Sequence, residues 1–293
     1  MFKRFRLLAF LSIMLLSSFA YAQDDVVTVT LWTETTLQEQ LDYLNENLVA
    51  PFEELHPNIN LEITGQEGIQ DLMRTAILGG TAPDILTTSG PGWNAEYIAG
   101  GFMESLQPYA DQYGWEDKLL PWAYATGTSN GVLYTVPTTY ESIVMFYNKT
   151  FFEEMGWTPP TNRAELEALA ATAQEAGIHP LTYGNQGQVF SNGHILSAYL
   201  NNYIEHDDLR AALLGEKPWT DEEFVEVINL LTSDMVDKVW WSGGVDNYYQ
   251  YGAEDFWAEL ANREAALLIV GTWGFDDAPT YFSETTDEWD WAP

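Results

Sequence analysis

The stretch GVLYTVPTTYESIVMFYNKTFFEEMGW, residues 131–157, decides how the chain is organised. Residues 132–136 form an apolar run that predicts a short strand, which ends at Pro137 because proline cannot donate to a sheet ladder and seldom lies inside a central strand. A polar link, residues 138–141, follows, and a second apolar run over residues 142–147 predicts another strand. Two strands joined by such a link are typical of a chain that crosses from one lobe to another. The stretch therefore predicts two lobes, a hinge at 138–141 and a cleft between the lobes.

The first 22 residues have the pattern of a secretory signal peptide. A positive head of one Lys and two Arg precedes the apolar run 7–19, which is short for a bilayer span, and residues 20–22 read Ala-Tyr-Ala, a small-x-small cleavage signal. An uncleaved anchor helix is the alternative. The chain contains no cysteine, so it offers no disulfide, no thiol chemistry and no lipid-carrying cysteine after the leader. We expect a freely soluble periplasmic or secreted protein.

The chain is strongly acidic, with 11 Lys and Arg against 44 Asp and Glu and a formal net charge of −33. Such a charge repels nucleic acid and anionic lipid, so neither is expected as a partner. The acidic residues are spread along the sequence, which indicates a solvated surface rather than a site for a cation. Because 46% of the residues are hydrophobic and 14% aromatic, the composition is that of a folded protein.

The length also favours two lobes, because about 270 residues after the leader suit two cores of roughly 100–150 residues each. In the first lobe, residues 23–138, apolar patterns predict strands over 26–32, 59–63 and 82–86 and helices over 37–55, 71–78 and 94–99. This βαβαβ order predicts a mainly parallel sheet, whose ligands lie outside the carboxyl ends of the strands. In the second lobe, residues 142–270, strands are expected over 179–183 and 265–270, and helices over 162–176, 192–203, 221–236 and 252–264.

Six motifs occur in the order found in extracellular solute-binding proteins of ABC importers, in the carbohydrate-binding branch, which most of residues 26–275 resembles. Besides the crossover at 131–157, they are an opening strand that ends in Trp32, HPNI at 56–59, APDI at 82–85, a Gly-to-Tyr element at 101–109, and a helix end that runs into Gly-x-Trp at 261–273. The family usually has Gly-Lys where this chain has Asn262-Arg263. The resemblance implies an α/β, periplasmic-binding-protein-like fold of type II, with two α/β lobes, a hinge and an interlobe cleft.

The resemblance has a further consequence for the C-terminal residues. In this family the chain crosses back to the first lobe near the Gly-x-Trp element, so residues 271–293 are expected to return to that lobe. The helices that would then complete the second lobe are missing from the sequence. We therefore expect an incomplete second lobe, with an abnormally apolar surface where those helices would lie.

Aromatic residues are abundant, with 12 Trp and 16 Tyr. An aromatic ring can cover the apolar face of a pyranose while polar side chains pair with its hydroxyl groups, a combination typical of small-molecule pockets. Aromatic residues at strand ends or in loops are better candidates than those at helical spacing, for which core packing is the alternative. The expected ligand-binding residues are Trp32, Glu34, Ser89, Trp93, Tyr140, Glu141, Asn185, Trp241 and Trp273, with one of the neighbouring Trp240 and Trp241 facing the ligand and the other the core.

Several common catalytic motifs are absent from the sequence. The sequence contains no G-x-x-x-x-G-K-[ST], no G-x-S-x-G and no H-E-x-x-H, and the scattered histidines have no metal-ligand spacing. Each histidine is interpreted as an ordinary surface or turn residue: His56, His179, His194 and His206. No catalytic residue, metal ion or cofactor is expected.

The resemblance thus implies a solute-binding protein, not an enzyme, that captures a mono- or oligosaccharide as a monomer and delivers it to the permease of an ABC importer. Two alternatives stay open. A secreted glycoside hydrolase would share the aromatic residues but needs two carboxylates roughly 5–10 Å apart, for which the sequence has no local signature. A binder of another solute, such as a polyamine, would suit the acidity, whereas a phosphate ligand such as glycerol-phosphate would require more Arg or Lys.

Overall fold

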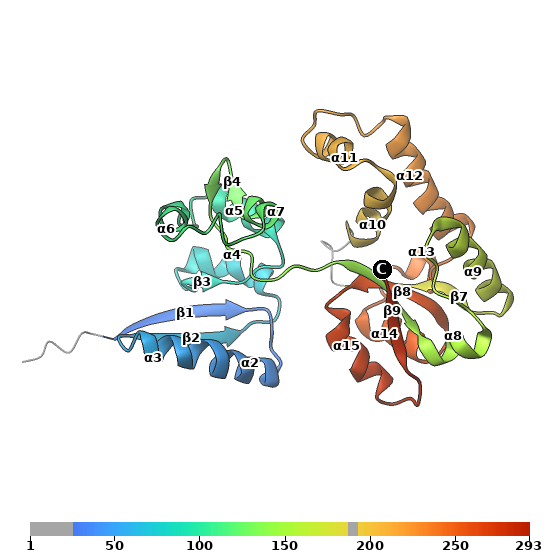
Figure 1. Ribbon diagram of the computed structural model, residues 1–293, viewed down its shortest axis with the longest axis horizontal. Coiled ribbons are helices and arrows are strands. Elements are labelled where there is room, and N and C mark those ends of the chain that lie inside the picture. The colour runs from blue at the N-terminus through green and yellow to red at the C-terminus, as the bar shows by residue number, and fades with distance from the viewer. Residues whose placement is uncertain (1–25, 187–192) are drawn as a thin grey trace, which may run out of the picture. The chain divides into compact units, whose positions relative to one another are not determined.

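A computed structural model of the chain describes residues 26–186 and 193–293 (Figure 1). The predicted signal peptide and Asn192, where a helix was expected to begin, lie outside the described residues. The chain divides into two compact units, Met1–Thr138 and Thr139–Pro293, and the boundary falls inside the predicted link 138–141. Each unit is described by itself.

The first unit contains a parallel sheet of three strands, β1 (Val27–Thr33), β2 (Ile59–Gly65) and β3 (Ile85–Leu86), in the order β2-β1-β3. Both neighbours of β1 are parallel to it, as the alternating pattern predicts. The strand expected over 82–86 is shorter than expected, because the backbone N–H of Asp84 bonds to the Thr30 side chain rather than to a ladder partner. After β2, the helices of the first unit are α4 (Ile69–Gly79), α5 (Pro91–Ala99), α6 (Gln107–Tyr113) and α7 (Pro121–Thr126).

The helix predicted over 37–55 forms in three consecutive parts, and its apolar face is not the predicted one. Between α2 (Gln38–Leu44) and α3 (Ala50–Leu55) lies a π-helical segment, η1 (Asn45–Val49). A π-turn adds one residue per turn and so rotates the residues that follow. Leu48 is consequently 44% exposed, and Val49 is buried in its place.

The crossover strand of the first unit is also shorter than the sequence predicts. β5 (Val132–Leu133) pairs antiparallel with β4 (Thr128–Ser129), and the ladder covers only these residues of the apolar run 132–136. The backbone N–H of Tyr134 donates to the carbonyl of Gly127 at 3.0 Å, which ends the hairpin.

The second unit is built on a mixed sheet of order β7-β8-β6-β9. β8 (Ala265–Gly271) is parallel to β7 (His179–Thr182) and antiparallel to β6 (Ile143–Asn148). Its helices are α8 (Lys149–Met155), α9 (Arg163–Glu175), α10 (Gly193–Tyr203), α11 (His206–Leu213), α12 (Glu222–Thr232), η3 (Ser233–Asp237), α13 (Gly244–Asn247), α14 (Ala253–Ala261) and α15 (Gly274–Phe282).

The expected return of residues 271–293 to the first unit is wrong. The last strand, β9 (Trp289–Ala292), pairs antiparallel with β6, so that Trp289 lies opposite Asn148 and Ala292 opposite Met145. The reason is packing: the Trp289 ring lies 6.0 Å from the Phe146 ring, and α15 packs on α14. Residues 271–293 therefore add a strand to the sheet of the second unit.

The core of the second unit is large and aromatic. Phe146 and Trp257 are fully buried and meet edge to face with 5.2 Å between ring centroids. Gly274 is required there, because a Cβ at this position would lie 2.9 Å from the Trp257 ring and 3.0 Å from the Phe146 ring. This core packs next to the carboxyl end of β8, which the candidate residue Trp273 follows.

Within residues 26–186 and 193–293, no helix has the length and apolar character that a membrane crossing requires.

Candidate functional site

In the first unit, the structure brings Glu34 and Ser89 together. Glu34 follows β1 and Ser89 follows β3, and the register of these parallel strands, with Trp32 opposite Leu86, brings both carboxyl ends to one edge of the sheet. The Ser89 hydroxyl donates to the Glu34 carboxylate, with 2.7 Å to Oε2. Both residues are exposed. The strand ends thus bring together two residues that the sequence analysis named separately as ligand contacts.

The two candidate tryptophans of the first unit are partly buried. Trp32 packs against the small core formed by Ile69, Met73 and Tyr97. Trp93 lies in the first turn of α5. Each indole can therefore offer only part of its surface to a ligand. For Trp32, the rest of the ring packs against the core.

The link between the units enters the second unit beside β8. Tyr140 is 74% exposed and Glu141 is also exposed. The next residue, Ser142, accepts a hydrogen bond from the backbone N–H of Thr272 at 2.9 Å. Glu141 precedes Ser142 and Trp273 follows Thr272, so both lie one residue beyond this hydrogen bond.

The carboxyl ends of β7 and β8 meet at one edge of the second sheet, because these strands are parallel neighbours. Trp273 follows β8 and is half-buried. Asn185 follows β7 and is only 2% exposed, and its backbone N–H donates to the carbonyl of Tyr248 at 2.8 Å. The structure thus collects both residues at one edge, with Trp273 the more accessible of the two.

Trp241 does not fit its predicted function. It is 1% exposed and Trp240 is 3% exposed, so both rings belong to the core and neither faces solvent. Trp241 forms a bridge to Leu181 of β7, whereas Trp240 stacks under the Arg163 guanidinium, whose Cζ lies 4.7 Å from the ring centroid. The expectation that one of the pair faces the ligand is therefore wrong. The segment that contains the two tryptophans pairs with β7 through Trp241, and both rings are buried.

Two residues near Trp273 were missed by the sequence analysis. The ring of His194 lies 5.2 Å from that of Trp273, and its Nδ1 lies 3.2 Å from the Tyr183 hydroxyl oxygen. Tyr183 immediately follows a parallel strand, so the rule that selected Trp32 and Trp273 could have found it. No spacing in the sequence marks His194, because the contact joins α10 to the end of β8.

A network of polar side chains supports the carboxyl end of β7. The Ser242 hydroxyl donates to Thr182 Oγ1 at 2.8 Å, and the Thr182 hydroxyl donates to Glu259 Oε2 at 2.7 Å. The Tyr251 hydroxyl donates to Glu259 Oε1 at 2.9 Å, and this bond raises the pKa of Tyr251 to about 12. Both carboxylate oxygens of Glu259 are thereby occupied, which makes this carboxylate a structural anchor of the strand end.

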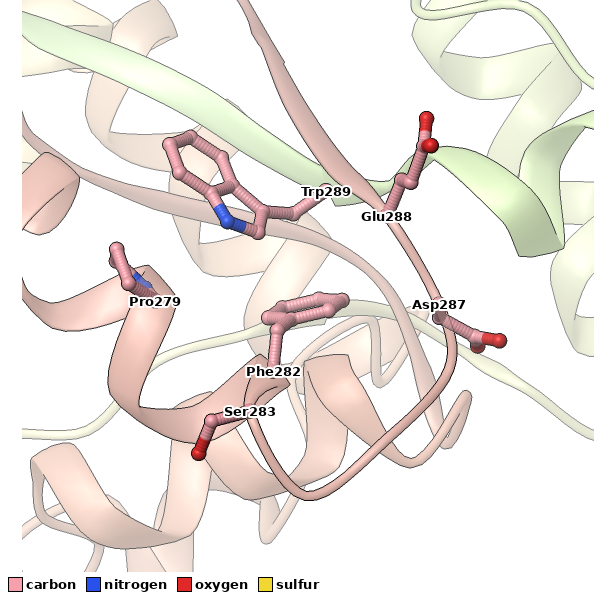
Figure 2. Close-up of a pocket in the computed structure, with 6 residues that line it drawn as sticks. All are labelled: Pro279, Phe282, Ser283, Asp287, Glu288 and Trp289. Carbon is pink, nitrogen blue, oxygen red and sulfur yellow. The ribbon is translucent and has the colours of Figure 1, made fainter.

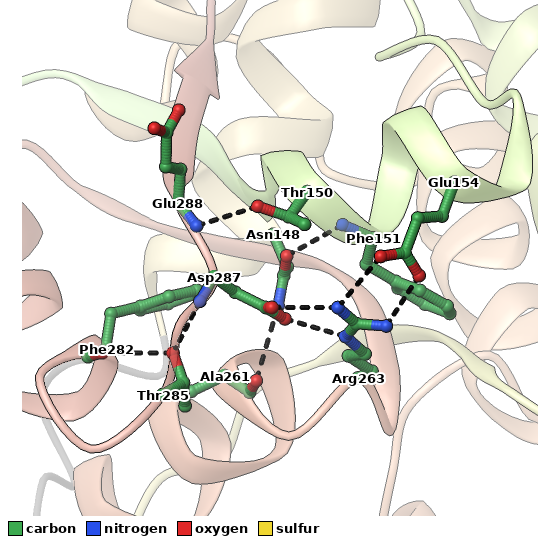
Figure 3. A network of polar contacts seen from close by, with 10 residues as sticks. All are labelled: Asn148, Thr150, Phe151, Glu154, Ala261, Arg263, Phe282, Thr285, Asp287 and Glu288. Atoms are coloured by element: carbon green, nitrogen blue, oxygen red, sulfur yellow. Dashed lines mark hydrogen bonds and ion pairs between the residues drawn. The ribbon is translucent and has the colours of Figure 1, made fainter.

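A second network fixes the segment that leads into β9 (Figure 3). The Arg263 guanidinium bonds Asp287 at 2.7 and 2.8 Å and Glu154 at 2.7 Å, and Asn148 Nδ2 donates to Asp287 at 2.8 Å. The hydrogen bond from Arg263 is the main cause that holds the pKa of Asp287 below its usual value. Asn262-Arg263, which stands where Gly-Lys is usual in the resembled family, thus ties α14 to α8 and to β9.

Two open grooves lie elsewhere in the second unit. One, of about 530 Å³, is lined by four acidic residues at the start of α12. The other, of about 370 Å³, lies between α15 and the segment before β9, and Figure 2 shows Phe282 and Trp289 pointing into it. Neither groove contains a predicted site residue. No group of three or more His, Cys, Asp or Glu in the described part of the chain could hold a metal ion.

Comparison with known proteins identifies the family. The sequence pattern of bacterial extracellular solute-binding proteins matches residues 34–293. The chain is 22% identical over 273 residues to the multiple sugar-binding protein of Streptococcus mutans, covering 88% of this chain and 60% of that protein. It is also 22% identical over 242 residues to the diacetylchitobiose binding protein NgcE of Streptomyces coelicolor, covering 80% and 50%. The chain thus spans about half to three fifths of the length of these relatives.

A solved structure from work on xylan utilisation by Caldanaerobius polysaccharolyticus superposes with a TM-score of 0.74 at 22% identity, over 91% of this chain and 67% of the other. This likeness confirms the predicted α/β, type II periplasmic-binding-protein-like fold. Together with the match over residues 34–293, it shows that the chain belongs to the family of bacterial extracellular solute-binding proteins.

Proposed function

We propose that this protein is an extracytoplasmic solute-binding protein that captures a mono- or oligosaccharide and delivers it to the permease of an ABC importer. The observation that carries the proposal is the half-buried indole of Trp273, held at the carboxyl edge of a packed sheet. Membership of the solute-binding family supports it, and so do the two relatives, one named for sugars in general and one for diacetylchitobiose.

The chemistry of the strand ends suits an uncharged sugar. An indole covers the apolar C–H face of a pyranose, and side-chain oxygens pair with hydroxyl groups that would cost about 1–3 kcal/mol each if buried without a partner. In the second unit the proposed contacts are Trp273, Tyr140, Glu141 and Asn185. In the first unit they are Trp32, Glu34, Ser89 and Trp93. Trp241 is no longer among them, because it is buried.

The proposal also includes binding without turnover. Membership of the solute-binding family supports this part of the proposal. We further propose that residues 1–22 are cleaved and that the monomer acts in the periplasm or outside the cell.

The test is a thermal-shift and calorimetric screen of the full chain with xylobiose, maltose, diacetylchitobiose and putrescine. A sugar that binds only the folded protein stabilises it by about 2.7 kcal/mol at one hundred times its Kd. Trp273→Ala should abolish this shift, whereas Trp122→Ala, which removes a 53% exposed indole from α7, should not. Products released from the sugars would instead favour a hydrolase, and a shift with putrescine alone would favour a polyamine binder.

A further inference from the structure

The indole of Trp273 is confined on one side by the backbone of its own strand. Gly271 is the last residue of β8, and a methyl group in place of its hydrogen would overlap the six-membered ring of Trp273. The indole therefore folds back over Gly271 at van der Waals distance. A glycine is required here by the close approach of the ring and not by its backbone angles, because Gly271 is not among the residues with positive φ.

His194 confines the same indole from another element. It is the second residue of α10, and its ring lies 5.2 Å from that of Trp273 at an interplanar angle of 47°. Tilted aromatic rings at such a distance attract each other through the edge of one ring and the face of the other. The imidazole thus provides a second support for the indole, at the edge of the sheet where the proposed ligand binds.

The imidazole is itself held in place. Its Nδ1 lies 3.2 Å from the hydroxyl oxygen of Tyr183, which is 3% exposed and stacks on Phe256 with 5.5 Å between ring centroids. His194 is half-buried, and burial lowers its pKa, so the imidazole is neutral near pH 7. A neutral imidazole can accept a hydrogen bond from the Tyr183 hydroxyl at Nδ1 and keep its own hydrogen on Nε2.

We infer that His194 is a positioning residue of the sugar site: as a neutral imidazole anchored by Tyr183, it holds the indole of Trp273 in the orientation that receives the ligand. This inference rests on the proposed function and adds to it a residue that the sequence analysis had set aside. It also gives the site a pH signature, because a ligand stacked on Trp273 would shield His194 further from water. Protonation of His194 then opposes binding.

Within residues 26–186 and 193–293, the groups in contact with His194 carry no charge that could offset this effect. They are the phenol of Tyr183 at the end of β7 and the indole of Trp273 at the end of β8. Behind Tyr183, the ring of Tyr248 lies 6.3 Å away, and burial raises its pKa well above the usual value, so it also stays neutral. Among the described residues, burial is the cause that lowers the pKa of His194, and a ligand that covers the ring more closely should lower this pKa further.

The first measurement needs no ligand. In the full chain, NMR resonances of the four histidine rings are followed from pH 8 to pH 5, and the signal of His194 is assigned with His194→Gln and the indole N–H of Trp273 with Trp273→Phe. The Trp273 resonance should move with the titration of His194 and should lose this pH dependence in His194→Gln. A Trp273 resonance that is indifferent to both overturns the inference, whether or not any sugar binds.

The second measurement uses xylobiose, maltose and diacetylchitobiose in calorimetry. For the sugar that binds, Kd should rise about fivefold to tenfold from pH 7 to pH 5 in the wild type. His194→Gln should weaken binding at pH 7 about threefold to tenfold and flatten the pH profile. The matched control His206→Gln, at the exposed start of α11, should change neither. An unchanged Kd and pH profile in His194→Gln overturns the inference and leaves the proposed function standing, whereas binding of none of the sugars overturns the proposed function, and the NMR result then decides for His194.

Discussion

The two units share an α/β architecture but differ greatly in how much apolar surface they bury. In the second unit, one buried cluster runs through the sheet and its helices and includes Phe146, Trp257 and Leu267 at 0% exposure. In the described part of the first unit, the buried cluster consists of Ile69, Met73 and Tyr97. Apolar burial is the dominant favourable contribution to folding. The second unit should therefore be the more stable of the two.

This difference bears on function, because each unit carries residues that we propose as ligand contacts. Trp273 rests on the deeply packed strand β8, with Gly271 and Gly274 shaped to the rings around them. Glu34 and Ser89, in contrast, follow strands that are less buried: in β1, Val27 is 55% exposed. A rigid element positions a binding group more accurately than a loosely packed one. The second unit is thus expected to fix the orientation of the ligand.

The largest effect should come from opening the larger core. Phe146→Ala removes a fully buried ring that touches Trp257, Phe275 and Trp289, and it should lower the free energy of unfolding of the second unit by about 3–5 kcal/mol. Met73→Ala should cost the first unit about 2 kcal/mol, at the low end for such changes, because its small surroundings can collapse. Urea unfolding followed by circular dichroism should show two transitions, the first unit unfolding first. If each variant unfolded in a single transition, this would contradict the expected difference in stability between the two units.

The next effect compares one ion pair of the second unit that has a buried partner with one exposed ion pair of the first unit. Arg163→Met removes the pair with Asp234, whose side chain is fully buried, and should destabilise the second unit by about 2 kcal/mol. The cost stays moderate because Tyr199 and Lys238 still donate to Asp234, at 2.7 and 2.9 Å. Arg74→Met breaks an exposed pair with Glu96 and should leave the first transition unchanged. Equal losses in both variants would show that burial does not distinguish the pairs.

Acid should reduce the same contribution from Asp234. Burial alone would raise the pKa of this carboxyl, but the hydrogen bonds from Arg163, Tyr199 and Lys238 outweigh burial and lower it. A lowered pKa means that the stabilisation is fully present above the unfolded value of about 3.9 and is lost as the pH falls through the folded value. Urea midpoints between pH 6 and pH 3 should fall less steeply in Asp234→Asn than in the wild type. Identical slopes would exclude Asp234 as a source of acid sensitivity.

Much of the fold could be predicted from local pattern, because parallel strands and their helices carry strong apolar periodicity. β1, β2, β6 and β8 lie within two residues of their predicted positions. The place of β9 could not be predicted, because pairing with β6 depends on the contact of Trp289 with Phe146 across the sheet. The resemblance misled on this point, since it supplied a path for residues 271–293 that the packing of this chain does not follow.

The positions of the candidate residues could be predicted where they depend on strand ends and not where they depend on side-chain burial. Parallel order alone brings Glu34 beside Ser89 and Trp273 to the edge that Asn185 shares. The prediction for Trp241 was wrong because the sequence does not distinguish an indole exposed in a loop from an indole buried in a core. His194 was missed for the opposite reason, since a scattered histidine gives no sign of the helix that carries it to Trp273.

A smaller effect should follow from filling the space beneath Trp273. Gly271→Ala places a methyl group inside the present position of the indole, so the ring must move away. Overpacking of this kind should cost the second unit about 1–2 kcal/mol and weaken sugar binding more than stability. The control Gly79→Ala adds a methyl group in α4 that meets only the Thr81 hydroxyl oxygen at 3.6 Å. Calorimetry in which Gly271→Ala binds sugar as well as Gly79→Ala would show that the indole is free to move without loss.

The smallest effect separates two neighbouring residues of the first unit. Val49 is 8% exposed in η1, which packs on β2, so Val49→Ala should cost about 1 kcal/mol. Leu48 is 44% exposed, and Leu48→Ala should change stability by less than about 0.5 kcal/mol, because alanine also favours the helix. The two changes can be compared in the first urea transition. A larger loss from Leu48→Ala would mean that the helix keeps a regular phase without the π-turn, and that the small core of the first unit is built from a different face of this helix.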